Sequence, residues 1–315
     1  MTGVRPIRER RPEVWAAWVA ADPKSRELLE LAGRVAAAPT TVLIRGESGV
    51  GKDLLAQLLH LLGPHAAEPI VKIDCASLPA ELVESELFGY ERGAFTGAEQ
   101  SKPGRLELAG GGSLVLDEVA ALGLPLQAKL LRVLEEKKFE RLGGRTTISI
   151  EARLVALTNA DLERAVAERS FREDLFYRLN VLPLVIPPLR ERRLDVRPLA
   201  EHFLEQLAQL HRRRRPRLTA EALAALENHD FPGNVRELRN LLERAFFNDG
   251  DEIVARDLPL HASAAPVEEK TLEQVEKEYI AAVLQRHRGR KSESAKVLGI
   301  SRKTLLEKRK RYQLD

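Results

Sequence analysis

Short apolar runs alternate with amphipathic helical segments in the first half of the chain. Runs of three or four residues rich in leucine, isoleucine and valine predict strands, and apolar residues spaced three or four positions apart predict helices between them. The predicted strands are Thr41–Ile44, Ile70–Ile73, Leu114–Leu116 and Leu154–Leu157. The clearest predicted helices are Leu54–Leu62 and Leu126–Leu134. This alternation predicts an α/β fold in which helices flank a parallel sheet.

The second half of the chain has a helical pattern. A last predicted strand, Val181–Ile186, is followed by three helical segments that indicate a small all-α lid. These segments are Val196–Leu210, Thr219–Asn228 and Val235–Phe246. Ala255–Glu269 contain proline and alanine with little periodicity and indicate a linker. Three helical segments follow the linker: Leu272–Gln285, Ser292–Leu298 and Arg302–Tyr312.

Composition places the chain among folded proteins, since 44% of its residues are hydrophobic and 31% are charged. The net charge of +3 is unevenly distributed. Residues 271–315 hold twelve Lys or Arg against six Asp or Glu, whereas the first 270 residues hold 38 against 41. The tail is therefore expected to meet a polyanion.

Neither a membrane span nor a secretory signal is visible in the sequence, which predicts a cytoplasmic protein with no membrane partner. Cys75 is the single cysteine, so an intramolecular disulfide and a cysteine metal cluster are both excluded. Because Cys75 follows an apolar run, we expect it to be a packing residue.

A glycine-rich segment follows the first predicted strand and opens the first predicted helix. It consists of Gly46, Glu47, Ser48, Gly49, Val50, Gly51, Lys52 and Asp53. Glycines let backbone N–H groups wrap phosphates, and Lys52 can reach the β and γ phosphates of a nucleotide. Asp53 stands where a hydroxyl usually contacts Mg²⁺, so a carboxylate or a water must replace that contact. An ordinary strand-to-helix turn is the alternative, but the position favours a nucleotide site.

Two acidic residues end the predicted strand Leu114–Leu116. Asp117 is predicted to hold Mg²⁺, directly or through water, and Glu118 to orient and deprotonate the attacking water. Thr158 and Asn159 follow the next predicted strand and could hold that water. Carboxylates at a strand end are often only solvated. Combined with the glycine-rich segment, however, they predict an ATPase that uses ATP and Mg²⁺.

Four further segments match one protein family in the family's own order. They are Glu84–Ala98, Phe171–Arg178, Pro187–Arg192 and Phe231–Leu238. With the nucleotide motifs, they resemble the AAA+ ATPases of the NtrC-type bacterial enhancer-binding proteins, which act on sigma-54 RNA polymerase. The resemblance is dense from about Lys24 to Phe247 and resumes in the tail.

The resemblance implies an AAA+ P-loop ATPase with a lid and a C-terminal helix-turn-helix domain. The expected divisions are an N-terminal extension (1–22), an ATPase and sigma-54 interaction subdomain (23–190), a helical lid (191–254), a linker (255–270) and a Fis-type DNA-binding domain (271–315).

The resemblance implies roles for three arginines. Arg172 and Arg178 would be arginine fingers that reach the ATP of a neighbouring subunit; in isolation each would more simply pair with Glu173 or Asp174. Arg236 would be the sensor arginine of the lid, although alone it would be read as a solvated helix cap.

Two aspartates also take their interpretation from the resemblance. Members of the family usually carry an acid at the position of Asp53, which therefore stays a second candidate for Mg²⁺. Asp74 stands where asparagine commonly holds the catalytic glutamate, so it is the candidate for the glutamate switch. An ionised aspartate cannot donate a hydrogen bond and would repel Glu118, so coupling to ATP hydrolysis is expected to differ here.

The most specific motif is a loop of small residues around one aromatic ring. By resemblance it contacts sigma-54, and its residues are Gly93, Ala94, Phe95, Thr96, Gly97 and Ala98. Two glycines allow the backbone to extend or fold while Phe95 presents an apolar anchor. Packing of Phe95 into its own domain is the alternative. The pattern of Arg141–Arg145 is typical of a hairpin, which makes this segment a second candidate for the surface that faces sigma-54.

The tail reads as helix, turn at Gly299, helix, and it resembles a Fis-type helix-turn-helix. Its expected core comprises Ala295, Leu298, Ile300, Leu305 and Leu306. The start of its last helix would meet base edges with Ser301, Arg302, Lys303 and Thr304. Later residues suited to phosphate contacts are Lys308, Arg309 and Arg311. A charged helical hairpin without a DNA role is the alternative.

These features predict an ATP-hydrolysing activator that binds enhancer DNA, forms a hexamer with a dimer as a candidate resting state, and converts the closed complex of sigma-54 RNA polymerase to the open complex. Two rivals share its parts. A replication or remodelling AAA+ ATPase would leave Gly93–Ala98 unexplained, and a nucleotide-switched repressor would leave Glu118 and two arginine fingers unexplained.

The segment before the ATPase is shorter than about two dozen residues, too short for a regulatory domain of usual size. A trans-acting regulator, control through oligomerisation, and a shortened chain therefore all stay open. Target genes and operator sequence cannot be read from the residues.

Overall fold

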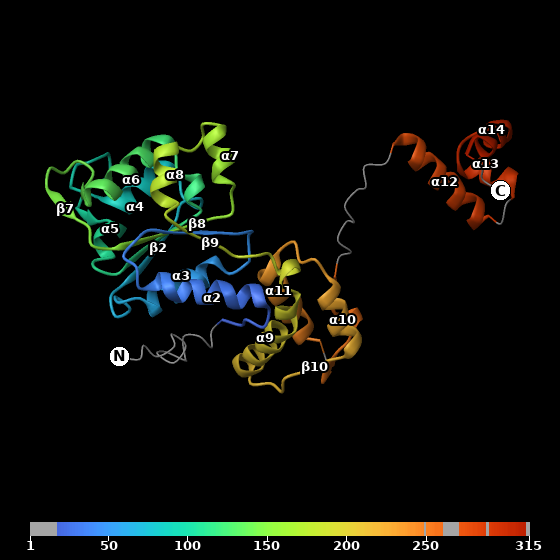
Figure 1. Ribbon diagram of the computed structural model, residues 1–315, viewed down its shortest axis with the longest axis horizontal. Coiled ribbons are helices and arrows are strands. Elements are labelled where there is room, and N and C mark those ends of the chain that lie inside the picture. The colour runs from blue at the N-terminus through green and yellow to red at the C-terminus, as the bar shows by residue number, and fades with distance from the viewer. Residues whose placement is uncertain (1–17, 249, 261–270, 288–289, 313–315) are drawn as a thin grey trace, which may run out of the picture. The chain divides into compact units, whose positions relative to one another are not determined.

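The computed structural model describes residues 18–248, 250–260, 271–287 and 290–312 (Figure 1). Contacts between residues divide the chain into two compact units, Met1–His261 and Ala262–Asp315. Within the described ranges, every helix is too short or too polar to cross a bilayer.

A five-stranded parallel sheet forms the centre of the first unit (Figure 1). Its strand order is β2-β5-β8-β1-β9, and every neighbouring pair runs parallel. The strands are β1 (Val42–Arg45), β2 (Ile70–Asp74), β5 (Ser113–Asp117), β8 (Arg153–Thr158) and β9 (Leu182–Val185). All five match predicted apolar runs, so the predicted α/β fold with a parallel sheet is confirmed.

Alternate residues of the central strands enter two different hydrophobic cores. Leu114 and Leu116 pack on one face of the sheet, whereas Val115 between them packs on the other. This follows from the period of two along a strand. The first face is covered by α4 (Ala80–Phe88), α6 (Leu124–Glu136) and α8 (Glu173–Leu179). The second face is covered by α2 (Pro23–Ala36) and α3 (Lys52–Leu62).

Two antiparallel hairpins project from this α/β layer structure. One pairs β3 (Gly89–Tyr90) with β4 (Lys102–Pro103), and the other pairs β6 (Lys138–Glu140) with β7 (Thr147–Ser149). The hairpin predicted around Arg141–Arg145 is confirmed as the turn of the second one. Short elements between the strands are α5 (Arg105–Leu108), η2 (Val119–Ala121), α7 (Leu162–Ala167), η3 (Leu189–Glu191) and η4 (Arg193–Asp195).

The lid consists of three helices around a core of its own. They are α9 (Val196–His211), α10 (Ala220–Asn228) and α11 (Asn234–Phe246). A small parallel pair joins β10 (Arg217–Leu218), in the connection between α9 and α10, to β11 (Glu252–Ile253), which follows α11. Phe231 and Asn234 both have positive φ, at 48° and 53°, which redirects the chain sharply into α11.

The linker prediction needs correction at its beginning. Residues 255–260 form η5 (Ala255–Asp257) and then bury Leu258, which is 4% exposed, in the lid core. Leu258 and Leu260 supply apolar side chains that a solvated linker would lack, which is why this stretch folds onto the lid. The remaining predicted linker residues, 261–270, lie outside the described residues.

The second unit contains α12 (Leu272–Arg286), α13 (Lys291–Val297) and α14 (Arg302–Tyr312). Gly299 has φ 65° in the turn between the last two helices, as a helix-turn-helix needs. The core of this second unit contains Ile280, Leu284, Ala295, Leu305 and Tyr312, with Leu298 and Ile300 partly buried. Leu306, predicted as a core residue, is instead 42% exposed, because Ile280, Leu284 and Tyr312 supply the apolar surface that covers Leu305.

We expect Leu242→Ala to lower the free energy of unfolding by about 2–5 kcal/mol, because Leu242 is fully buried in the lid core. The matched control Leu210→Ala changes a lid leucine that is 74% exposed, and should cost less than about 0.5 kcal/mol. Urea unfolding followed by circular dichroism measures both. Equal losses from the two variants would contradict this packing.

Candidate nucleotide and DNA sites

The glycine-rich segment forms a loop between β1 and α3, as predicted. Gly51 lies at the N-terminus of α3 with φ 106°, and Gly49 has φ 79°. A Cβ atom on Gly49 would lie 2.4 Å from the backbone oxygen of Gly233 in the lid. Glycine is therefore required at this position both by backbone conformation and by the close approach of the lid.

Lid residues and the segment before the lid bind this loop directly. Asn234 Nδ2 donates to Glu47 Oε2 and to the backbone oxygen of Ser48, both at 3.0 Å. Arg190 forms a bidentate pair with Glu47, at 2.8 and 2.6 Å. Hydrogen bonds from Arg190, ahead of those from Asn234, hold the pKa of Glu47 below its usual value. Buried Arg192 adds a bond from Nη2 to the Val50 oxygen, at 2.8 Å.

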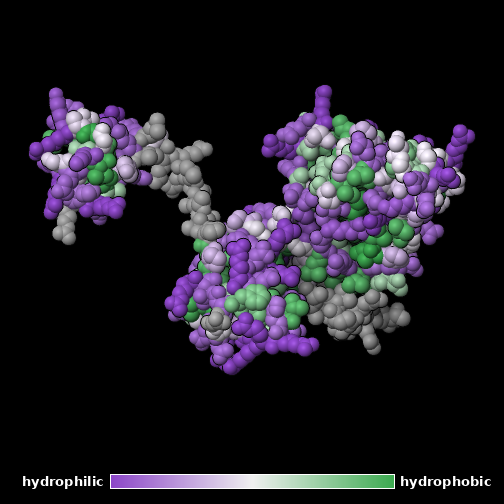
Figure 2. Space-filling model, turned by 180° about the vertical axis from the view of Figure 1, so that it is seen from behind, coloured by the Kyte–Doolittle hydropathy of each residue, from purple (hydrophilic) through white to green (hydrophobic). Residues whose placement is uncertain are grey.

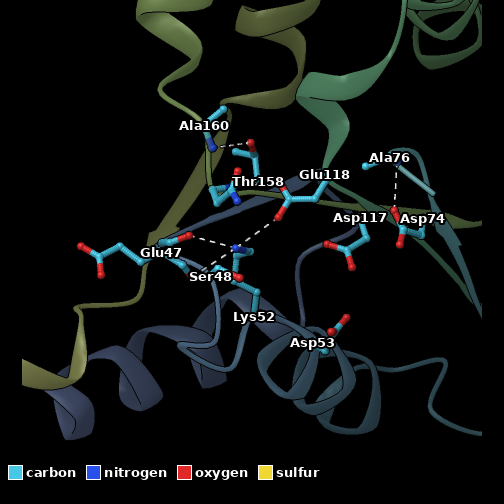
Figure 3. A network of polar contacts seen from close by, with 12 residues as sticks. Glu47, Ser48, Lys52, Asp53, Asp74, Ala76, Asp117, Glu118, Thr158 and Ala160 are labelled. Atoms are coloured by element: carbon cyan, nitrogen blue, oxygen red, sulfur yellow. Dashed lines mark hydrogen bonds and ion pairs between the residues drawn. The ribbon is translucent and has the colours of Figure 1, made fainter. Parts of the chain in front are cut away.

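Lys52, where the loop enters α3, lies close to Glu118 at the end of β5 (Figure 3). Lys52 Nζ donates to the oxygen of Gly46 at 2.9 Å and lies 3.6 Å from Glu118 Oε1. Glu118 Oε2 accepts the backbone N–H of Asn159 at 3.0 Å. Asn159 thus contacts Glu118 through its backbone, whereas the prediction concerned its side chain. Glu118 also has φ 50°, a left-handed conformation that is rare for a residue other than glycine and is found at functional sites.

Asp74 binds the backbone that follows it in its own chain (Figure 3). Its Oδ1 accepts the N–H groups of Ala76 and Ser77, at 2.9 and 3.2 Å. The adjacent Cys75 is 4% exposed, which confirms its packing role. Burial, aided by nearby carboxylates, raises the pKa of its thiol to about 12, so Cys75 stays uncharged.

Lys72 is a charged residue of the site that the motif analysis missed. From β2 it pairs with both Asp53 and Asp117, and the distance from Nζ to Asp117 Oδ2 is 2.7 Å. Burial alone would lower the pKa of Lys72, but its bonds to the two aspartates raise it. The sequence could have indicated this residue. Residues two positions apart in a strand point to the same face, so Lys72 shares a face of β2 with Asp74.

The loop, the acids and the lid enclose a cavity of about 260 Å³. Its lining includes Lys52, Asp53, Asp117, Glu118 and Arg236, which brings most of the predicted nucleotide residues together. Arg236 Nη1 donates to Ser48 Oγ at 2.9 Å. Lid residues missed by the sequence analysis also line the cavity: Phe203, Val235 and Arg239.

The ring of Trp18 packs close to the glycine-rich loop at Gly51. The ring is 7% exposed, and a Cβ on Gly51 would lie 3.7 Å from it. The indole Nε1 is buried without a hydrogen-bond partner among the described residues.

The two predicted arginine fingers lie away from this cavity. Arg172 pairs with Asp174, at 3.0 and 2.7 Å. This local ion pair is the alternative to an arginine finger that the sequence left open. Arg178 donates from Nη2 to the backbone oxygen of Leu134, at 3.0 Å. Neither side chain lines the cavity of its own chain.

The loop Gly93–Ala98 closes on itself at the end of the β3–β4 hairpin. Gly93 N donates to Ala98 O at 2.9 Å, and both glycines have positive φ, 82° for Gly93 and 99° for Gly97. Phe95 is 46% exposed, with one edge against Tyr90 at 5.0 Å between ring centroids. The ring is thus neither buried nor fully free.

The second hairpin contacts the base of this loop. Glu91 N donates to Leu142 O at 2.9 Å, and Leu142 N donates to Gly89 O at 3.0 Å. Arg141 binds both Glu91, at 3.1 Å, and Glu107, at 2.6 Å. The two candidate contact surfaces therefore form one joined structure.

The second unit has a mostly hydrophilic surface (Figure 2). At the start of α14, Ser301 Oγ accepts the N–H of Thr304 at 3.0 Å and caps the helix. Arg302 and Lys303 are exposed beside it. Two of the predicted phosphate ligands already pair with acids of α12: Lys308 with Glu276 at 2.5 Å, and Arg311 with Glu273 at 2.7 Å. Arg309 is partly buried.

Comparisons with known proteins agree with this arrangement. Residues 18–185 match the sigma-54 interaction domain, residues 190–275 the AAA+ ATPase lid domain, and residues 271–312 the bacterial regulatory proteins of the Fis family. The regulatory protein AtoC of Escherichia coli is 42% identical over 96% of this chain and 68% of its own length. This chain belongs to the sigma-54-dependent transcription activators.

Further relatives support the assignment. The nitrogen fixation protein VnfA of Azotobacter vinelandii is 45% identical over 92% of this chain and 57% of its own. A crystal structure of NtrX from Brucella abortus in complex with ATP has a TM-score of 0.72 and 38% identity, over 94% of this chain and 69% of that one. The predicted family, AAA+ fold, ATPase class and Fis-type DNA-binding region are confirmed for this sigma-54 activator.

We expect Gly49→Ala to weaken ADP binding about tenfold, because a Cβ would strain the positive φ and clash with Gly233 in the lid. Gly110→Ala is the matched control, since Gly110 has φ 51° but no neighbour within 4 Å of an added Cβ. Titration with a fluorescent ADP measures both affinities. Equal weakening in the two variants would contradict the role of the lid contact, because Gly110 does not line the cavity.

Proposed function

We propose that this activator hydrolyses ATP in a hexameric ring, bound to enhancer DNA, and converts the closed complex of sigma-54 RNA polymerase to the open complex. The observation that carries the proposal is the Gly93–Ala98 loop, mounted on a hairpin of the same unit that contains the nucleotide cavity. A repressor with a passive nucleotide site would need no such exposed loop.

The chain's own residues account for the hydrolytic step. Lys52 would leave the oxygen of Gly46 to bind phosphate, and Arg236 would bind the γ-phosphate from the lid. Glu118 would take a proton from the attacking water. The N–H of Asn159 fixes the Glu118 carboxylate, and a fixed base loses less energy to reorientation.

The carboxylates fit a magnesium ion. Asp53 and Asp117 converge on one cationic group, and oxygen donors are what Mg²⁺ prefers. No group of three or more candidate ligands occurs in the described part of the chain. Two carboxylates together with phosphate oxygens match the usual Mg²⁺–nucleotide site, in which the ion neutralises developing charge on the phosphates.

The position of the fingers supports an assembly. Since Arg172 and Arg178 lie away from their own cavity, they could act only on the nucleotide of another subunit. Such fingers contribute about 10³–10⁵ in rate. On assembly, Arg172 would exchange Asp174 for a phosphate. A dimer is the proposed resting state, with regulation by oligomerisation or by a trans-acting protein.

The tail would anchor the ring on DNA. Ser301, Arg302, Lys303 and Thr304 at the start of α14 are suited to base edges. Lys308, Arg309 and Arg311 are suited to phosphates, for which Lys308 and Arg311 would exchange their bonds to α12.

For Glu118→Gln, we expect ATP binding to persist and hydrolysis to fall by a factor of about 10² or more, because an amide cannot accept the proton of water. Glu135→Gln, an exposed change on α6, is the control and should hydrolyse ATP normally. Phosphate release at saturating ATP measures both. Unchanged hydrolysis by Glu118→Gln would remove Glu118 from the role of base.

Thr96→Ala tests the function as a whole. The variant should hydrolyse ATP as the wild type does, yet form open complexes about tenfold less on a sigma-54 promoter, because an exposed contact to polymerase is lost. Ser101→Ala, an exposed hydroxyl in the same β3–β4 connection, is the matched control. In vitro transcription and permanganate footprinting report the result. Normal promoter opening by Thr96→Ala would refute the loop's role.

A further inference from the structure

Lys72 occupies the point on which the two candidate magnesium ligands converge. It comes from β2, whereas Asp117 ends β5 and Asp53 lies in the first turn of α3. Its ammonium bonds Asp53 and lies 2.7 Å from Asp117 Oδ2. Three elements distant in sequence thus meet at one cationic side chain.

Charge explains why a cation belongs there. Asp53 and Asp117 are both negative, and their mutual repulsion would separate them if nothing lay between them. Glu118 adds a third carboxylate to the same cavity, while Lys52 is engaged with Gly46 and Glu118. Lys72 is therefore the cation that holds Asp53 and Asp117 together.

Stability alone is a weak reason for this pairing. The side chains of Lys72 and Asp53 are 43% and 51% exposed, and ion pairs at such exposure add little to the free energy of folding. Asp117, in contrast, is only 16% exposed, so its charge is poorly solvated and needs a cation beside it. The pairing matters most at the metal-binding face of Asp117.

We propose that Lys72 is a built-in counter-cation that competes with Mg²⁺ for Asp53 and Asp117, so that the nucleotide-free protein binds the ion weakly. This inference rests on the magnesium site of the proposed function. Two carboxylates and one ammonium carry a net charge of −1, which a divalent ion overcompensates; without Lys72 the charges would balance. ATP phosphates bring the additional negative charge that lets Mg²⁺ enter beside or in place of the ammonium.

The consequence is an order of binding. Free Mg²⁺ would not fill the site ahead of nucleotide, so the ion and ATP enter together. The acids are meanwhile kept close to their working positions, because Lys72 maintains the convergence that the ion later uses.

The test is a titration of the nucleotide-free protein with Mn²⁺, whose unbound fraction is measured by electron paramagnetic resonance. Lys72→Met should bind Mn²⁺ about tenfold more tightly than the wild type, because an adjacent positive charge is removed. Lys72→Gln, which keeps a hydrogen-bond donor without the charge, should behave alike and serves if Lys72→Met does not fold. Asp117→Asn should weaken binding in either background.

Lys102→Met is the matched control. Lys102 has a similar exposure of 48%, but it pairs with Glu86, which does not line the nucleotide cavity, whereas Lys72 pairs with two carboxylates that do. Its removal should leave the Mn²⁺ affinity unchanged. Circular dichroism and thermal melting establish that each variant is folded.

Equal or weaker Mn²⁺ binding by folded Lys72→Met and Lys72→Gln would overturn the competition. The competition would also be overturned if Lys102→Met tightened Mn²⁺ binding as much as Lys72→Met does, because the effect would then come from overall charge. Failure of the wild type to hydrolyse ATP would contradict the proposed function instead, and the metal titration would still decide the role of Lys72.

Discussion

The ATPase unit depends on one buried amide, the side chain of Asn234. It is fully buried in a left-handed conformation, where its oxygen accepts the N–H of Leu189 at 2.8 Å. Its Nδ2 group bonds Glu47 and the backbone of Ser48, both at 3.0 Å. Because an unpaired buried amide costs about 1–3 kcal/mol, the lid and the phosphate loop cannot separate without a penalty. The phosphate-binding loop is thus shaped by residues almost 190 positions away along the chain.

Because the lid is held against the glycine-rich loop, residues from the lid as well as residues from the α/β part line the cavity. Lys52 begins α3 and Asp117 ends β5 of the sheet, whereas Arg236 enters from α11, two residues after Asn234. A bound nucleotide would therefore touch both layers at once. A change in its phosphates would alter contacts that fix the lid, which is the kind of differential contact that a conformational change requires.

The sheet could be predicted from sequence because its strands carry their signal locally. Leu114 to Leu116 is apolar on both faces, as a buried parallel strand must be, and Gly49 and Gly51 mark a backbone that few other residues can adopt. The partners of charged side chains could not be predicted in this way. The pairing of Lys72 with Asp53 and Asp117 depends on the strand order of the sheet. The exposure of Leu306 likewise depends on how α12 packs.

In the proposed mechanism, the state of the nucleotide at Glu118 has to reach the Gly93–Ala98 loop. The family's usual asparagine would hold the glutamate from β2, but Asp74 offers no donor when ionised and caps its own turn. That turn leads into α4, and β3 begins directly after α4, so the turn and the loop lie at the two ends of one nine-residue helix. Glu118 is instead held from β8 by the N–H of Asn159. In this chain the glutamate and the turn at Asp74 are therefore anchored separately, and motion of one need not require motion of the other.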